Sequence, residues 1–263
     1  MDECNLSKFL STHSDISRRH AAEAIKKGEV RVNGEICTNP GTRIHSEDVV
    51  YLRHELVRHE LEQKVYVMLH KPRGYVCTAE DPHAPKKAID LLQGHGLPRL
   101  FSAGRLDKNS EGLILFSNDG IWVDELTHPS HQITKTYQVS LEHPLFPRDI
   151  MRLTKSGIMD DGERLRAAQI VEETKTRYLF VLTEGKNREI RRMIDAIHNR
   201  VTRLKRIAVG RLNLGSLPIG TWRSLSQGEV KAALEPSFFQ EKTKISPDSE
   251  NSRNILKKQK LNS

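Results

Sequence analysis

The sequence has few cysteines and no long apolar run. Its three cysteines, Cys4, Cys37 and Cys77, are far apart among 263 residues, which argues against a disulfide framework and against a thiolate metal site. No apolar stretch approaches the roughly 18 residues that a membrane span needs. The polar start Met1–Asn5 lacks the apolar core of a signal peptide. We therefore expect a cytoplasmic protein with no membrane attachment.

Motifs of several enzyme classes are also absent. Gly94-His95-Gly96 lacks the third glycine and the preceding strand of a dinucleotide-binding loop, and no phosphate loop or Gly-x-Ser-x-Gly elbow occurs. His54 and His59 are five residues apart, whereas a zincin helix needs its two histidines at i and i+4. The sequence therefore predicts no metal site and gives no support to a serine hydrolase.

Positive charge is present in excess and is unevenly distributed. The net charge of +8 divides into −2 over residues 1–63, +7 over residues 64–235 and +3 over residues 236–263. The range Lys186–Arg211 alone holds nine basic residues and two acidic ones. An excess of lysine and arginine favours phosphate-rich partners, so this stretch is predicted to contact phosphates. The alternative is a solvated helix face.

The first 60 residues predict a small unit of helices and hairpins. Apolar residues in Leu6–Leu10 have helical spacing. A second helix is predicted to begin at Ser17, a good N-cap, and to end before Gly28. Asn33-Gly34 predicts a tight hairpin turn. Residues 53–63 are charged and are expected to form a linker.

Strand patterns dominate from Val65 onward. Alternating apolar residues in Val65–Leu69 and around Tyr137 predict strands, and the continuous run Leu113–Phe116 predicts a buried one. Glu189–His198 has the spacing of a helix. Strands and helices interleave without regular βα alternation, which predicts an α+β fold. Residues 236–263 are rich in Lys, Ser, Asn and Asp, and predict a disordered basic tail.

The segment Ala103–Gly112 leads directly into the predicted buried strand. Gly104 and Gly112 bracket a loop that carries Asp107. A carboxylate on such a loop can serve as a nucleophile or a base, because the strand fixes the backbone while the loop stays accessible. The alternative is a turn aspartate that binds nearby amides.

These residues form part of a larger pattern. Arg105-Leu106-Asp107 with Ser110 and Gly112, followed by an apolar run and Asn118-Asp119-Gly120, resembles the catalytic motif of the bacterial pseudouridine synthases. Three more blocks occur in that family's order. They are the Lys-Pro-x-Gly turn in Leu69–Gly74, the tyrosine strand Lys135-Thr136-Tyr137, and the Gly-x-x-x-Gln/Glu-hydrophobic-Arg block in Glu184–Met193.

The first segment is similar to a second known domain. Ser17-Arg18-Arg19, Gly28 and Val32-Asn33-Gly34 resemble the S4-like RNA-binding domain of the ribosomal-RNA branch of the family. The resemblance is closest to the large-subunit enzymes, partly because Glu189 stands where other branches carry Gln. It implies an S4-like domain over residues 1–60 and a catalytic domain over residues 64–235, with a mixed, largely antiparallel sheet flanked by helices.

The resemblance also implies the reaction. A specific uridine in ribosomal RNA, in the 23S molecule, would be flipped out of its helix and isomerised to pseudouridine. The glycosidic bond would break with the help of a carboxylate, and the base would reattach through C5, without cofactor or metal. The implied partner is ribosomal RNA or a ribosome assembly intermediate, and a monomer is expected.

Roles for individual residues follow from the matching positions. Asp107 corresponds to the family's catalytic carboxylate, Tyr137 to the tyrosine that stacks on the flipped base, and Arg191 to the arginine that pairs with the carboxylate. Arg105 corresponds to a residue that fills the space left by the flipped nucleotide. Two alternatives stay open, namely that Tyr137 is an ordinary strand aromatic and that Arg191 contacts a phosphate.

Other residues are predicted to hold the RNA. In the catalytic domain these are Lys71 in the opening turn and Arg188 and Arg192 on either side of Arg191. In the first domain the predicted RNA-facing set is Ser17, Arg18, Arg19, Lys27 and Arg31. The alternative for Lys27 is that it complements the C-terminus of a helix.

Two rival functions make different demands on the sequence. A non-catalytic ribosome-associated RNA-binding protein would bind ribosomal RNA and change no uridine, and the intact Asp, Tyr and Arg set argues against it. An S4-like domain fused to a methyltransferase would need a glycine-rich nucleotide loop after a strand, and none is present. The sequence therefore favours an RNA-modifying isomerase.

Overall fold

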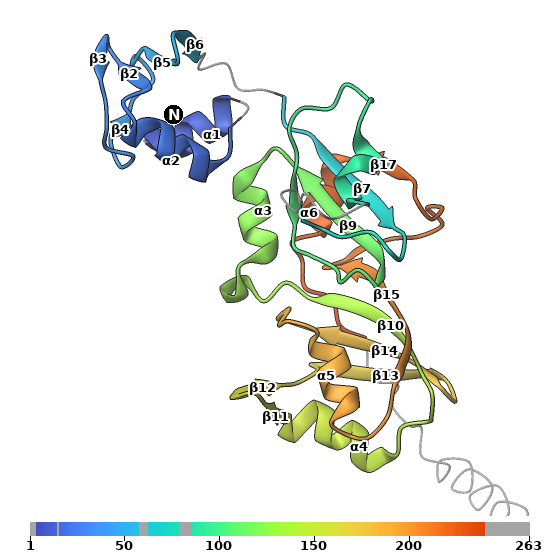
Figure 1. The fold of residues 1–263 in the computed structure, drawn as a ribbon. Coiled ribbons are helices and arrows are strands. Elements are labelled where there is room, and N and C mark those ends of the chain that lie inside the picture. Colours follow the sequence, from blue (N-terminus) through green and yellow to red (C-terminus); the bar gives the residue numbers. More distant parts are fainter. Residues whose placement is uncertain (1–3, 15, 58–62, 79–85, 240–263) are drawn as a thin grey trace, which may run out of the picture.

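The computed structural model describes residues 4–14, 16–57, 63–78 and 86–239 (Figure 1). They form a small first unit and a larger second one, which Figure 1 shows side by side. None of the described helices has both the length and the apolar character that a membrane crossing requires. The predicted tail lies, from residue 240 on, outside the described residues.

The first unit packs two helices against short strands around a core of its own. Leu6, Leu10, Ile25, Val30 and Val50 are fully buried in that core. The strands β3, β2, β5 and β6 form a four-stranded sheet in that order, and β1 pairs with β4. The elements are β1 (Cys4–Asn5), α1 (Leu6–His13), α2 (Arg18–Lys26), β2 (Val30–Val32), β3 (Glu35–Ile36), β4 (Arg43–Ile44), β5 (Val50–Leu52) and β6 (Glu55–Val57).

Local signals set the ends of these elements. Ser17 caps α2, with its hydroxyl oxygen accepting a hydrogen bond from the backbone N–H of His20, and Gly28 follows the helix at φ +75°. Asn33-Gly34 forms the predicted turn with both φ values positive. The predicted linker begins too early, however. Arg53 and His54 also adopt positive φ and make a second turn, so that β6 extends the sheet.

The second unit is built on a nine-stranded sheet. Its order is β13-β14-β10-β15-β9-β7-β17, with β8 beside β9 and β16 beside β15. All pairs are antiparallel except β15 with β9. The strands are β7 (Tyr66–Lys71), β8 (Phe101–Ala103), β9 (Glu111–Ser117), β10 (Lys135–Leu141), β13 (Gln169–Thr174), β14 (Arg177–Leu182), β15 (Val201–Val209), β16 (Leu212–Asn213) and β17 (Trp222–Ser224). The predicted α+β fold is confirmed.

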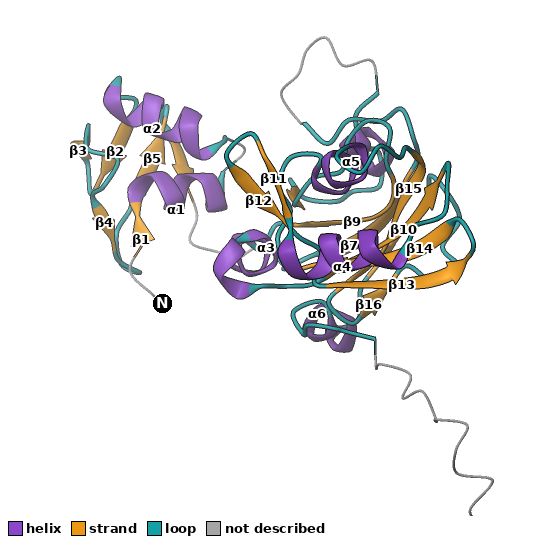
Figure 2. Cartoon of the chain, turned by 90° about the horizontal axis from the view of Figure 1, so that it is seen from below, coloured by secondary structure: helices purple, strands orange, loops and turns teal. Residues whose placement is uncertain are grey.

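Helices cover both faces of this sheet, and Figure 2 shows α5 and α6 on opposite sides. Ile114 and Phe116 of β9 face the core with α5, whereas Leu113 and Leu115 face the core with α3 and α6. Burial on both sides explains why this strand has a continuous apolar run. The remaining elements are α3 (Gly120–Thr127), α4 (Pro147–Met151), α5 (Glu189–Asp195), α6 (Gln227–Ala232), a small hairpin of β11 (Ile158–Asp160) and β12 (Glu163–Leu165), and short turns of helix at Ala88–Leu92, Pro129–His131 and Arg152–Ser156.

Candidate active site

A cavity of about 340 Å³ is lined by residues at the start of α5 and at the end of α3. Its walls come from the loop ahead of β9, from the loop ahead of α5, and from the strands β10 and β15. Asp107 lines it from the first loop and Tyr137 from β10. Four segments that are far apart in the sequence therefore meet at one site.

Lys71 holds the loop that carries Asp107 through a hydrogen bond to the loop backbone. This lysine is fully buried, and its ammonium group donates hydrogen bonds to the carbonyl oxygens of Ser110 at 2.7 Å and Pro72 at 3.0 Å. Burial lowers the pKa of Lys71 below its ordinary value. The prediction that Lys71 contacts RNA is therefore wrong, because its charged end binds the backbone of the loop and has no access to solvent.

Gly112 lets the same loop lie close to β15. A Cβ atom at this position would be 2.2 Å from the carbonyl oxygen of Arg206, and the φ of Gly112 is +111°. Only glycine adopts this conformation without strain and leaves room for the neighbouring backbone. The parallel pairing of β9 with β15, and with it the position of Asp107 against the sheet, depends on this contact.

Arg191 lies beside Asp107. Its Nε is 3.8 Å from Oδ2 of Asp107, and its Nη2 donates to the carbonyl oxygen of Asn109 at 3.3 Å. The Arg191 side chain is 14% exposed and that of Asp107 is 31% exposed. Burial, and next the nearby Arg188, lower the pKa of Arg191, while Asp107 acts in the opposite direction. A guanidinium remains charged despite such a shift, so Arg191 places a positive charge beside the Asp107 carboxylate.

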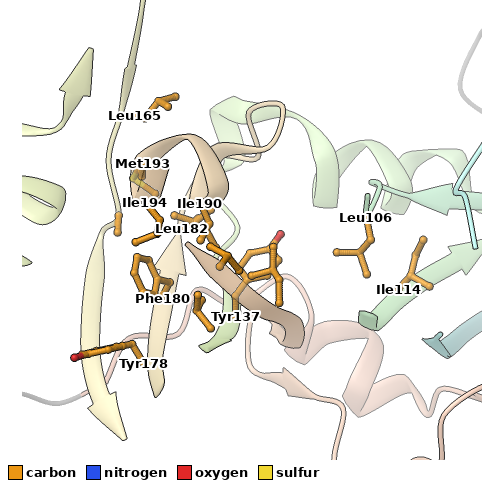
Figure 3. Packing of buried hydrophobic residues seen from close by; sticks show 14 of the residues in the cluster. Leu106, Ile114, Tyr137, Leu165, Tyr178, Phe180, Leu182, Ile190, Met193 and Ile194 are labelled. Atoms are coloured by element: carbon orange, nitrogen blue, oxygen red, sulfur yellow. The ribbon is translucent and has the colours of Figure 1, made fainter. Parts of the chain in front are cut away.

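Tyr137 presents an apolar ring on the sheet side of the cavity. The residue is 8% exposed and packs in the core cluster that includes Leu182 and Ile190 (Figure 3). It lies directly opposite Arg206 on β15. A ring that is held by the core and still lines a cavity is a rigid platform for stacking.

The loop ahead of α5 is shaped by Glu189. This carboxylate is buried and accepts a hydrogen bond from the backbone N–H of Lys186 at 3.1 Å, and burial raises its pKa. Arg188, the residue before the helix, has a φ of +48°. These contacts fold the loop over the cavity and place Arg191 within the first turn of α5.

Arg105 and Arg188 are exposed at the edge of the cavity. Neither forms an ion pair with a residue in the described ranges. Their positions allow contact with a nucleic acid that enters the site.

Arg192 has a different environment. Its Nε donates to Asp160 at 2.5 Å and its Nη1 to Glu163 at 2.6 Å, which ties α5 to the hairpin of β11 and β12. Its Nη2 donates to the carbonyl oxygen of Asp160 at 2.8 Å. The prediction that Arg192 holds a phosphate is wrong, because each of its donor nitrogens already has a partner in the protein.

The basic stretch Lys186–Arg211 is likewise not one phosphate-binding surface. Arg188, Lys205 and Arg206 form no ion pair with the described part of the chain, and Arg206 is buried. Six of its nine cations lie beside carboxylates, namely Lys186, Arg191, Arg192, Arg200, Arg203 and Arg211.

The first unit offers a second group of predicted RNA contacts. Arg18, Arg19 and Lys27 are exposed, and no ion pair joins them to residues that the structure describes. The Nη1 of Arg31 donates to the carbonyl oxygen of Gly34 at 2.9 Å. Ser17 acts as the helix cap, so its oxygen is already engaged within the protein.

Lys135 is a cavity residue to which sequence reasoning assigned no role. It lies two residues before Tyr137 on β10. Residues two apart on a strand point to the same face, so the predicted strand around Tyr137 could have placed Lys135 beside this tyrosine. Among the described residues, no group of three or more His, Cys, Asp or Glu side chains could hold a metal ion.

Comparison with known proteins gives consistent results. A family model described as RNA pseudouridylate synthase matches residues 65–196, and the S4 domain model matches residues 5–50. The ribosomal large subunit pseudouridine synthase B of Bacillus subtilis is 35% identical over 86% of this chain and 93% of its own. The ribosomal small subunit pseudouridine synthase A of Escherichia coli K12 is 32% identical over 87% and 99%.

A solved structure has the same fold. The crystal structure of a pseudouridylate synthase has a TM-score of 0.64 and 31% sequence identity, covering 87% of this chain and 99% of that one. A catalytic region of this fold preceded by an S4 domain defines a class of RNA-modifying enzymes. The chain belongs to the RNA pseudouridylate synthase family. It is accordingly an isomerase that converts uridine to pseudouridine.

Proposed function

We propose that this protein isomerises a uridine of large-subunit ribosomal RNA, the 23S molecule, in the cavity around Asp107. The observation that carries the proposal is the Asp107–Arg191 pair, with 3.8 Å between Nε and Oδ2, whose carboxylate lines the same cavity as Tyr137. Relatives named for the large and for the small subunit have similar identity, so small-subunit RNA is the alternative target. We expect a monomer in the cytoplasm, acting on ribosomal RNA or on an assembly intermediate.

The first step is extrusion of the nucleotide. A uridine stacked in an RNA helix does not expose C1′ and C5, and flipping it out costs a few kcal/mol. Stacking on an aromatic ring such as Tyr137 recovers about 1–3 kcal/mol. We propose that Arg105, exposed at the rim of the cavity, occupies the space that the flipped nucleotide leaves.

The second step is the exchange of bonds. The bond between N1 and C1′ breaks with its electron pair passing to the base, and the C5–C1′ bond forms. The proton on C5 is lost and N1 gains one, so the reaction has no net reactant besides uridine. We propose that Asp107 acts at C1′, either as a covalent nucleophile or by stabilising positive charge on the sugar. Arg191, whose Nε lies 3.8 Å from Oδ2 of Asp107, holds this carboxylate in place.

The test uses purified protein and transcripts of both ribosomal RNAs. Chemical mapping of pseudouridine should show one new site with the wild type and none with Asp107→Asn, which keeps the shape of the side chain and removes its charge. Modification by the mutant would overturn the role of Asp107. If the wild type binds the RNA and changes no uridine, in transcripts or in cells with and without the protein, the chain is an RNA-binding protein and the proposed function is wrong.

A further inference from the structure

Two cations in the cavity stand out because they form no ion pair within the described part of the chain. Lys135 and Arg206 both line it, and neither forms an ion pair with a carboxylate in the described part of the chain. Arg206 is 4% exposed, its Nε donates to the carbonyl oxygen of Leu113 at 2.7 Å, and its Nη2 is buried without a hydrogen-bond partner among the residues that the structure describes. A buried, unpartnered guanidinium nitrogen is costly, and its presence indicates a group that arrives with the substrate.

The backbone brings these cations next to the stacking ring. Arg206 of β15 lies directly opposite Tyr137 of β10, and Lys135 precedes Tyr137 by two residues on the same strand. The three side chains line one cavity. A base that stacks on Tyr137 therefore has both cations close to its edge.

We propose that Lys135 and Arg206 form a cationic subsite that binds the uracil ring as an anion after its bond to the ribose has broken. The inference rests on the proposed function. When the N1–C1′ bond breaks, the electron pair leaves with the base, and the negative charge spreads over N1 and the two carbonyl oxygens. The charge disappears again once C5 has bonded to C1′, the C5 proton has left and N1 has been protonated.

Such a subsite accelerates the reaction because it binds the anion more strongly than the neutral base. Fixed cations in a closed site stabilise developing charge without having to reorganise, and removing one donor of this kind costs about 100- to 1000-fold in kcat. Asp107 and the subsite then act on opposite fragments, the carboxylate on the sugar and the two cations on the base.

The protonation state of Lys135 should make the reaction rate depend on pH. Burial, followed by the charge of Arg206, lowers the pKa of Lys135 to about 8, whereas Glu189 of α5 acts to raise it. The other charged side chains that line the cavity are Arg105, Asp107, Glu184, Lys186 and Arg188. Lys135 is a cation below pH 8 and neutral above it, so the rate should fall as the pH rises through this value.

The experiment compares kcat and KM of the full-length protein on a ribosomal RNA transcript that the wild type modifies, between about pH 6 and pH 10. Lys135→Met keeps an unbranched chain and removes the charge, and should lower kcat about 100-fold with KM changed by less than about threefold. Lys135→Arg should retain most of kcat and lose the decline near pH 8, because a guanidinium stays charged. Lys231→Met, an exposed lysine of α6 on the other face, is the control.

The inference fails if Lys135→Met keeps the kcat of the wild type, or if Lys135→Arg is active and still loses activity near pH 8. If Lys135→Arg does not fold, the pH profile of the residual activity of Lys135→Met is the test. This activity should not decline near pH 8, and a decline there would contradict the inference. A wild type that modifies no uridine contradicts the proposed function instead. The two failures are therefore distinguishable.

Discussion

The catalytic cavity and the S4 domain hold their positive charges in opposite ways. At the catalytic site, Arg206 in the cavity wall and Arg191 beside Asp107 are mostly buried and are held by backbone carbonyls or by Asp107. In the S4 domain, Arg18 and Arg19 are exposed on α2 and Lys27 is exposed directly after it, while Ala21, Ala24 and Ile25 of the helix are buried. Charges held in fixed positions can stabilise a transition state, whose geometry is defined. Exposed, long side chains can instead bind a phosphate backbone in many arrangements. The comparison predicts that changes in the cavity affect the rate and changes in the S4 domain affect the affinity.

The largest effect is expected from Gly112→Ala. The added Cβ would lie 2.2 Å from the carbonyl oxygen of Arg206 and would adopt a strained positive φ, so β9 and β15 have to separate. We expect a loss of about 3–5 kcal/mol in the free energy of unfolding, measured by urea denaturation, and no detectable activity. The control is Gly120→Ala, because nothing lies within 4 Å of a Cβ at the start of α3 and its φ is ordinary. Equal stability of the two variants would contradict the close approach.

The next largest effect, a loss in kcat, is expected from removing the arginine partner of Asp107. Arg191→Met fills much of the same space without a charge, and should lower kcat about 100-fold while RNA affinity changes little. Single-turnover rates and a binding assay on the same transcript measure the two quantities. A variant with normal rate and weakened binding would show that Arg191 is a phosphate contact.

Two neighbouring arginines are predicted to have different partners, RNA for Arg188 and the protein itself for Arg192. Arg188→Ala should reduce the slope of log affinity against log salt by about 1, because an unpaired cation at the rim neutralises one phosphate. Arg192→Ala should leave the slope unchanged and lower the melting temperature, because Asp160 and Glu163 lose their partner. The same slope change in both variants would contradict this division.

The smallest effect is expected in the S4 domain. Arg18→Gln with Arg19→Gln should weaken binding several-fold and reduce the salt slope by up to about 2, with no change in the rate at saturating RNA. Arg53→Gln is the matched control, since this exposed arginine already pairs with Glu29 at 2.6 Å. An altered rate at saturation would place the S4 arginines in the catalytic step.

Patterns that are local in sequence predicted much of the fold. The cap at Ser17, the Asn33-Gly34 turn and the apolar run of β9 each depend on neighbouring residues, and each is found where it was expected. The helix at Glu189 begins as predicted and ends at Asp195, before the predicted end. The strand β15 was missed, because its basic residues hid an alternation that only pairing with β10 and β9 reveals.

The environments of charged residues required the tertiary structure. A lysine in a turn is ordinarily exposed, yet Lys71 is buried because the carbonyl oxygen of Ser110, far along the chain, accepts a hydrogen bond from its ammonium group. Arg192 is tied to acidic residues of a hairpin that its own sequence neighbourhood does not indicate. Lys135 was identified only as part of the tyrosine block and received no role, because its neighbour Arg206 reaches the cavity from another strand.

The division of labour between the two regions is tested most directly by one paired measurement. The dissociation constant and the single-turnover rate at saturation are determined on the same ribosomal RNA transcript for Asp107→Asn and for the Arg18→Gln, Arg19→Gln variant. We predict that the first keeps its affinity and forms no pseudouridine, and that the second binds more weakly and keeps its rate. Pseudouridine formed by Asp107→Asn, or a rate lost in the S4 variant, would contradict the assignment of chemistry to the cavity and of RNA holding to the S4 domain.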